Sequence, residues 1–244
     1  MTNEWQGLDR GRDRVLLKLF AAIASGDFHG VTRQLDEVPG LVTWPLRVGA
    51  TRQDPHTYFL PSIRHYVYAG DTALHLAAAG HQPELSELLV ARGADVRARN
   101  RRGAEPLHYA ADGRPGADVS DQGAQRMVIN SLIESGADPN AIDRSGVAPL
   151  HRAVRNRCSV AVGALIENGA DPRLKNKSGS TPLHLAVQNT GKGHSGSDEA
   201  KDEQRRIIAF LLEHGASPID VDANGKTVVD AASSDWIRAQ LRNL

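Results

Sequence analysis

A short motif recurs along the chain and constrains its fold more than any other feature. Four segments ending in Leu-His carry it, at residues 72–75, 105–108, 148–151 and 181–184. Their histidines are 33, 43 and 33 residues apart. A second marker, Gly-Ala-Asp or Gly-Ala-Ser, occurs at residues 93–95, 136–138, 169–171 and 215–217, with spacings of 43, 33 and 46 residues. Two markers that share a period of 33 indicate a chain built from repeated structural units.

Each unit has the sequence pattern of two helices joined by turns. Proline is tolerated at the first helical position, where its missing N–H would have no partner, and it stands there as Pro106, Pro149 and Pro182. Apolar stretches follow, and each second stretch ends in glycine, which adopts the left-handed conformation that closes a helix. A single helical pair cannot bury its apolar face, so neighbouring pairs are expected to stack and share a core.

The period and the motif Thr-Pro-Leu-His-x-Ala resemble those of the ankyrin repeat, most clearly over residues 67–232. The resemblance implies an all-α ankyrin-repeat solenoid of about six helix-turn-helix units with short β-turn or hairpin tips. We expect four clear repeats between an N-terminal and a C-terminal cap. The expected layout is one domain over 1–244, with a helical cap at 1–37, an aromatic-rich insertion at 38–66, the repeats at 67–221 and a second cap at 222–244.

The insertion at 38–66 is the largest departure from the repeat pattern. It contains Trp44, Tyr58, Phe59 and Tyr66, and Tyr68 follows closely. These aromatic side chains either fold over the first repeat and seal its core, or they anchor a binding partner, since Tyr and Trp dominate binding hot spots. Two smaller insertions, of 10 and 13 residues, fall near 113–124 and 189–203. We expect both to be solvated loops, because neither has the spacing of a phosphate-binding or a calcium-binding loop.

The recurring histidines are candidate metal ligands, but their spacing argues against that role. Stacked helices lie about 8–10 Å apart, whereas two imidazoles on one zinc ion each lie about 2 Å from the metal. The resemblance implies instead that His75, His108, His151 and His184 bond backbone groups of the turns and tie neighbouring repeats together. Cys158 lacks a recognisable catalytic partner in the sequence and is expected to be half-buried. We therefore expect no catalytic residue, no metal site and no cofactor.

Cysteine content and hydropathy favour a cytoplasmic protein. The single cysteine allows no intrachain disulfide, which is typical of a reducing compartment. The first apolar run, at 15–24, is interrupted by Lys18 and is too short to span a membrane. We expect no membrane association.

Charge is balanced overall but unevenly distributed. Lys plus Arg and Asp plus Glu both number 29. The turn and inner-helix segments 97–115, 141–157 and 171–190, expected on the concave side, contain twelve basic and four acidic residues. The outer helices carry acids such as Glu84, Glu134 and Glu213. Because Arg101, Arg144 and Lys177 occupy equivalent turn positions, stacking is expected to place them in one row.

This distribution predicts a non-catalytic protein-interaction module whose groove binds another protein with an acidic surface. The expected contact residues are Arg101, Arg102, Tyr109, Arg144, Arg152, Arg155 and Lys177. Three alternatives stay open at this point. The basic side chains could be paired internally or merely solvated, the row could bind nucleic acid, or an enzyme site could lie in the 44–68 region beside His56 and His65.

Overall fold

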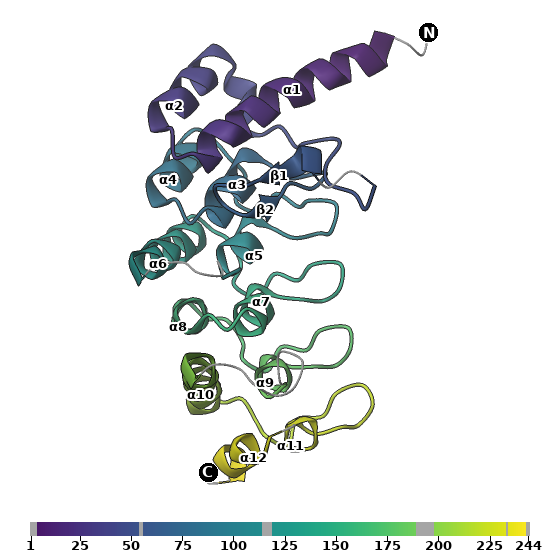
Figure 1. The fold of residues 1–244 in the computed structure, drawn as a ribbon, viewed down its shortest axis with the longest axis vertical. Helices are drawn as coiled ribbons and strands as arrows, with labels where there is room; N and C mark the ends of the chain where they lie inside the picture. Colours follow the sequence, from purple (N-terminus) through teal and green to yellow (C-terminus); the bar gives the residue numbers. More distant parts are fainter. Residues whose placement is uncertain (1–3, 54–55, 114–118, 189–197, 233, 243–244) are drawn as a thin grey trace. The chain divides into compact units, whose positions relative to one another are not determined.

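The computed structural model describes residues 4–53, 56–113, 119–188, 198–232 and 234–242, and of 4–10 and 119–121 only the backbone. The chain divides into two compact units, one formed by 1–110 and 114–138 and the other by 111–113 and 139–244. We describe each unit by itself (Figure 1). Within the described residues, no helix has the length and apolar character needed to cross a membrane.

The first unit contains six α-helices, two short 3-10 helices and one small hairpin among its described residues. They are α1 (Glu4–Ala24), α2 (Phe28–Glu37), η1 (Pro39–Val42), η2 (His56–Tyr58), β1 (Phe59–Leu60), β2 (His65–Tyr66), α3 (Ala73–Ala79), α4 (Pro83–Ala91), α5 (Pro106–Ala110) and α6 (Val119–Glu134). The inner helices α3 and α5 pack side by side, α1 packs on α3, and the outer helices α4 and α6 pack together (Figure 1).

Helices α1 and α2 form the N-terminal end of the first unit. The core of this end is formed by apolar residues on one face of α1, among them Leu16, Leu19, Phe20 and Ile23, all completely buried. Helix α1 begins at Glu4, about ten residues before the first apolar residue of that face. Apolar periodicity detects only the buried part of a helix, so the apolar pattern of the sequence does not reveal the first turns of α1.

The insertion at 38–66 is bound to the first repeat by its backbone. The Leu46 amide donates to the Asp71 carbonyl at 2.8 Å, the Gly70 amide donates to the Leu46 carbonyl at 2.6 Å, and the Ala50 amide donates to the Val67 carbonyl at 2.7 Å. Aliphatic residues close the core here: Leu41, Val42, Leu46, Ala50 and Ile63 are buried. The aromatic residues stay half-buried or exposed, and Phe59 packs against Tyr66 across the hairpin with ring centroids 4.8 Å apart. The aliphatic side chains of the insertion, rather than its aromatic ones, therefore seal the core of the first repeat.

The second unit continues the same alternation of short inner and longer outer helices. Its elements are α7 (Pro149–Arg155), α8 (Ser159–Glu167), α9 (Pro182–Ala186), α10 (Asp198–Glu213), α11 (Val228–Ala231) and α12 (Asp235–Arg242). Inner helices α7 and α9 pack together, as do outer helices α8 and α10. Helix α12 covers the end with Ile237 and Leu241 buried.

The two smaller insertions differ from the expected loops. Helices α6 and α10 have 16 residues each, whereas α4 and α8 have nine. Residues 119–124 and 198–203 are therefore helical, so the expectation of loops there was wrong. Asp198 and Glu199 stabilise the first turn of α10, where carboxylates interact favourably with the helix dipole. The other inserted residues, 114–118 and 189–197, lie outside the described part of the chain.

The all-α repeat architecture expected from the sequence is confirmed. Both units are stacks of helical pairs joined by tight turns. The expectation that 1–244 forms one domain stays a prediction.

Candidate functional site

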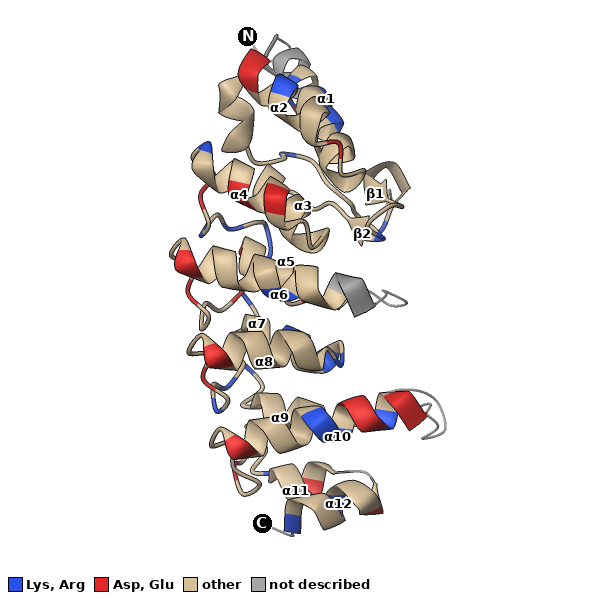
Figure 2. Ribbon diagram, turned by 90° about the vertical axis from the view of Figure 1, so that its left-hand side faces the viewer, with Lys and Arg blue, Asp and Glu red and all other residues tan. Residues whose placement is uncertain are grey.

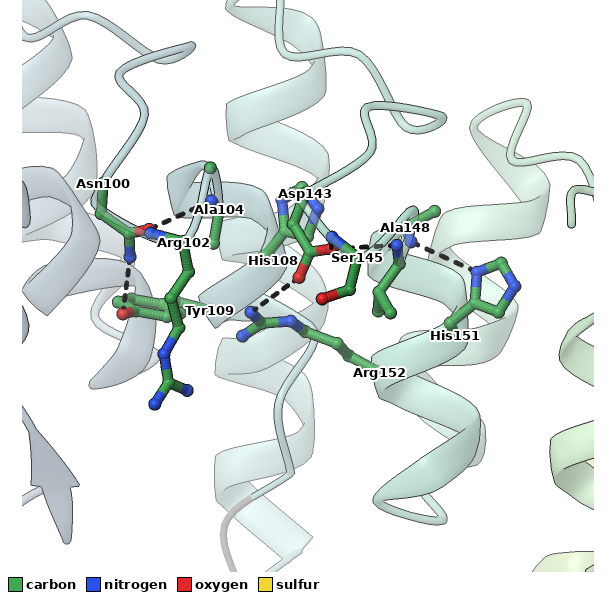
Figure 3. A network of polar contacts seen from close by, with 12 residues as sticks. Asn100, Arg102, Ala104, His108, Tyr109, Asp143, Ser145, Ala148, His151 and Arg152 are labelled. Carbon is green, nitrogen blue, oxygen red and sulfur yellow. Dashed lines mark hydrogen bonds and ion pairs between the residues drawn. The ribbon is translucent and has the colours of Figure 1, made fainter. Parts of the chain in front are cut away.

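Each described turn tip is closed by one side-chain oxygen that accepts two backbone N–H groups. In the second unit, Oδ1 of Asp143 accepts from Ser145 at 2.7 Å and from Val147 at 3.0 Å. In the first unit, Oδ1 of Asn100 accepts from Arg102 at 2.9 Å and from Ala104 at 3.1 Å. Figure 3 shows both turns. Such turns fix the direction of the residue that follows the Asx, which in these two turns is Arg101 or Arg144.

Neighbouring turns inside the second unit are joined by backbone hydrogen bonds. The Lys177 amide donates to the Ser145 carbonyl at 3.2 Å, and the Ala223 amide donates to the Ser178 carbonyl at 3.0 Å. A Cβ atom added at Gly146 would lie only 2.8 Å from the Lys177 nitrogen, so the turns touch through their backbones. The turns that carry Arg144 and Lys177 are therefore direct neighbours. Arg101 belongs to the first unit, where its amide donates to the Ala69 carbonyl at 2.8 Å.

Five of the seven expected contact residues have exposed side chains. In the first unit these are Arg101, whose guanidinium also donates to the Ala50 carbonyl at 3.3 Å, and Arg102, whose guanidinium lies 4.2 Å from the centre of the Tyr68 ring. In the second unit they are Arg144, Arg155 and Lys177. Within the described part of the second unit, none of these three side chains forms an ion pair.

Arg152 and Tyr109 lie elsewhere than the sequence suggested. The Arg152 side chain is only 14% exposed and donates to the Asp112 carboxylate at 2.9 Å. It also lies 3.7 Å from the Asp143 carboxylate (Figure 3). Burial raises the pKa of Asp112, and Arg152 opposes that rise. Tyr109 is 3% exposed and its hydroxyl donates to Asp71 at 3.1 Å. Neither side chain offers a partner an accessible polar group, so we leave both out of the proposed contacts.

Other basic residues of the same segments bond to the protein itself. Arg99 pairs with Glu105 at 3.4 Å, and Arg173 pairs with Asp220 at 2.7 Å. Three more donate to backbone carbonyls: Arg97 to Gly136, Lys175 to Val221 and Arg157 to Gln188. Arg114 lies outside the described residues. Part of the positive charge counted from the sequence is therefore neutralised by ion pairs or held by hydrogen bonds within the protein.

A buried polar cluster in the first unit was missed in the sequence. The Asp71 carboxylate is completely buried and accepts from the Tyr68 amide at 2.7 Å, from Nδ2 of Asn100 at 2.9 Å and from the Tyr109 hydroxyl at 3.1 Å. Burial raises the pKa of Asp71 to about 6, and these hydrogen bonds and the nearby His65 limit the rise. The sequence contains one sign of this cluster: the residue before the motif is Asp71 in the first repeat, whereas it is Ala104, Val147 or Ser180 in the others.

The cluster fastens the insertion to the turn of the next repeat. Tyr109 packs edge-on against His65 and His75, with centroid distances of 4.6 and 5.3 Å. Because Asp71 is inaccessible to a reactant, the arrangement is suited to holding the first unit together rather than to proton transfer with a substrate. His56, the second histidine of the enzyme alternative, is exposed.

The motif histidines have the structural role that the resemblance implied. Nδ1 of His75 and of His151 accepts from the backbone N–H three residues earlier, at 3.2 Å in both cases. Nε2 therefore carries the proton and donates to a carbonyl of the following turn, to Ala104 from His75 and to Ser180 from His151. His184 repeats this arrangement towards Lys226. Burial lowers the pKa of His151, which favours its neutral form.

The remaining chemical candidates are metal ligands and Cys158. No group of three or more His, Cys, Asp or Glu side chains there is placed to hold a metal ion. Cys158 is half-buried and precedes the first turn of α8 as its N-cap residue.

Comparison with known protein families agrees with this geometry. A family model described as "Ankyrin repeats (many copies)" matches residues 132–186, and the model of the single ankyrin repeat matches residues 69–101 and 178–224. A comparison with curated proteins finds no match. The matched segments contain His75, His151 and His184 and the whole turn at 176–179. The chain therefore belongs to the ankyrin-repeat family.

Proposed function

We propose that the chain is a non-catalytic module that binds a partner protein with an acidic surface through its turn tips and inner helices. Ankyrin repeats generally mediate protein–protein interactions, and proteins of this family are typically non-catalytic. The proposed contacts are Arg101 and Arg102 in the first unit and Arg144, Arg155 and Lys177 in the second.

The adjacency of Arg144 and Lys177 is the observation that carries the proposal. Their turns are joined by the hydrogen bond from Lys177 to Ser145, and both side chains are exposed. Since both turns are also closed by an Asx oxygen, the two cations sit on a rigid frame. A rigid pair of cations attracts and orients an acidic surface with little loss of conformational freedom on binding.

In the first unit, Arg102 has a second property that suits an interface. Its guanidinium stacks on Tyr68, and Tyr68 follows the insertion that interrupts the repeat pattern. Stacking holds the guanidinium plane in place while its N–H groups stay available to carboxylates, and arginine binds carboxylates bidentately.

The outer helices have the opposite charge character, which supports a preferred binding face. In the first unit, Glu84 and Glu87 lie on α4, and in the second unit α8 and α10 end in Glu167 and Glu213 (Figure 2). An acidic partner is repelled by these residues and attracted by the turn tips. Charge complementarity of this kind affects association rate and specificity more than affinity.

The test is a double charge reversal in the second unit, Arg144→Glu with Lys177→Glu, used in affinity capture from an extract of the source cell. The matched control, Lys201→Glu with Arg206→Glu on α10, changes the net charge equally and removes the ion pairs with Asp198 and with the half-buried Glu203. We expect the wild type and the control to retain one partner, and the tip variant to bind that partner roughly tenfold more weakly or worse.

Equal affinity of all three proteins would refute the proposal. A separate titration with duplex DNA at two salt concentrations examines the nucleic-acid alternative. Tight binding that weakens steeply with salt would indicate phosphate contacts and favour that alternative.

A further inference from the structure

A cavity in the first unit lies where helix α1 meets the insertion. Its volume is about 760 Å³, within the range of small-molecule sites. One face of α1 forms the first wall through Arg14, Leu17, Lys18 and Ala21. Arg14 and Lys18 are four positions apart, as are Leu17 and Ala21, so two cations and two apolar side chains line one side of the helix.

The opposite wall comes from the insertion and is held firmly in place. It consists of Arg47, Val48 and Tyr58. The Asp13 carboxylate accepts from the backbone N–H of Arg47 at 3.2 Å and of Val48 at 3.1 Å, so it ties this wall to α1. One residue earlier on α1, the Arg12 guanidinium lies 4.1 Å from the centre of the Trp44 ring.

The same wall is also attached to the first repeat. The Ala50 amide donates to the Val67 carbonyl, and the Val67 amide donates to the Tyr58 carbonyl at 2.8 Å. Both sides of the cavity are thus fixed before a ligand arrives. Preformed sites bind more tightly because less conformational freedom is lost on binding.

The lining combines apolar surface with positive charge. Val48 is 57% exposed although it is apolar, and it faces the same cavity as Leu17 and Ala21. Among the described lining residues, Arg14, Lys18 and Arg47 carry three positive charges against one carboxylate, that of Asp13, which already accepts two N–H groups. A ligand that matches this lining has an apolar body and an anionic group.

We propose that this cavity binds a small organic anion with an aliphatic body, of the chemical class of a medium-chain or long-chain carboxylate. The anionic group lies near Arg14, Lys18 and Arg47, and the aliphatic chain covers Leu17, Ala21 and Val48. The residues that line this site are none of the proposed turn-tip contacts, so the proposal does not depend on the proposed protein partner.

A second cavity of the first unit has the wrong charge for such a ligand. It measures about 680 Å³ and is lined by Phe28, Leu85 and Leu88, but also by Glu84 and Glu87. It serves as an internal comparison, because a purely hydrophobic ligand would bind either cavity whereas a carboxylate should avoid the acidic one.

Isothermal titration of the full chain at neutral pH with decanoate, below its micelle concentration, tests the proposal, with decanol as the neutral isostere. We expect saturable one-to-one binding of decanoate and roughly tenfold weaker binding of decanol. Arg14→Glu with Lys18→Glu should raise the Kd of decanoate at least tenfold, and Val48→Asp should do the same from the opposite wall. All three residues are exposed, so these variants keep the core intact.

Two controls make the result decisive. Lys201→Glu with Arg206→Glu carries the same change in net charge and should bind decanoate like the wild type. Phe28→Ser alters the acidic cavity and should also leave binding unchanged. The proposal is wrong if decanoate does not bind, if decanol binds equally well, if the Arg14 and Lys18 variant keeps wild-type affinity, or if Phe28→Ser removes binding. Co-sedimentation with phosphatidylglycerol vesicles distinguishes the source of the anion, and attachment to vesicles without binding of monomeric decanoate would also contradict it.

Discussion

The contact between successive turns can be tested with a matched pair of glycine substitutions. Gly179 and Gly225 occupy the same position in consecutive turns and have nearly the same backbone conformation, with φ of +72° and +75°. They differ in what lies next to them. A Cβ atom at Gly179 would lie 2.3 Å from the Ala223 nitrogen and 2.9 Å from the Asp222 carbonyl carbon. Among the described residues, no atom lies within 4 Å of a Cβ atom at Gly225.

The two substitutions should therefore have different costs. Alanine at positive φ costs about 1–2 kcal/mol, and the lower entropy of the unfolded chain offsets about 0.4–1 kcal/mol of this. Gly225→Ala should thus destabilise by about 1 kcal/mol. Gly179→Ala also forces the next turn away, which adds about 1–3 kcal/mol of overpacking and weakens the hydrogen bond from Ala223 to Ser178. We expect its total cost to be about 2–4 kcal/mol.

Urea unfolding followed by circular dichroism measures both variants. The midpoint should fall further for Gly179→Ala than for Gly225→Ala, and the slope should stay close to that of the wild type if unfolding is cooperative. Equal destabilisation by the two substitutions would show that the turns do not support one another, and would refute the stacking geometry described above.

Two further predictions concern the buried polar groups. Burial raises the pKa of Asp71 to about 6, so the folded state binds this proton more tightly than the unfolded state. The resulting stabilisation is complete below about pH 4 and is lost as the pH rises through about 6. From pH 8 to pH 5, the unfolding free energy of the wild type should rise by roughly 1 kcal/mol relative to Asp71→Asn, and parallel pH profiles in urea titrations would contradict this. His184→Asn should keep the bond to the Thr181 amide but leave the Lys226 carbonyl without its donor. A loss of about 1–3 kcal/mol in the same assay is expected, and an unchanged midpoint would show that this imidazole does not join the repeats.

Much of the fold could be predicted because the repeats report the same structure several times. The prolines mark the starts of α5, α7 and α9, and the histidine roles follow from their fixed place in the motif. The lengths of the helices were harder to predict from the sequence. The first turns of α6 and α10 contain few apolar residues, so nothing in the hydrophobic pattern distinguishes them from loop.

The candidate site was less predictable than the fold, because it depends on pairing. The sequence shows that Arg152 and Arg155 are both basic, but not that Arg152 points to Asp112, forty positions earlier, while Arg155 stays exposed. In the same way, the sequence predicts Tyr109 as a contact residue because it lies on an inner helix, whereas in the structure its hydroxyl donates to Asp71. Such contacts join residues from different repeats, and even an unusual residue such as Asp71 does not show in the sequence which side chain it pairs with.

Hydrogen exchange of the complex with the captured partner, read out by mass spectrometry, tests the central claim most directly. We predict that binding slows exchange at the turns around residues 100–103, 143–146 and 176–179 and leaves the outer helices α4 and α8 unchanged. Slower exchange confined to α4 and α8, with the basic turns unaffected, would contradict the assignment of the binding surface.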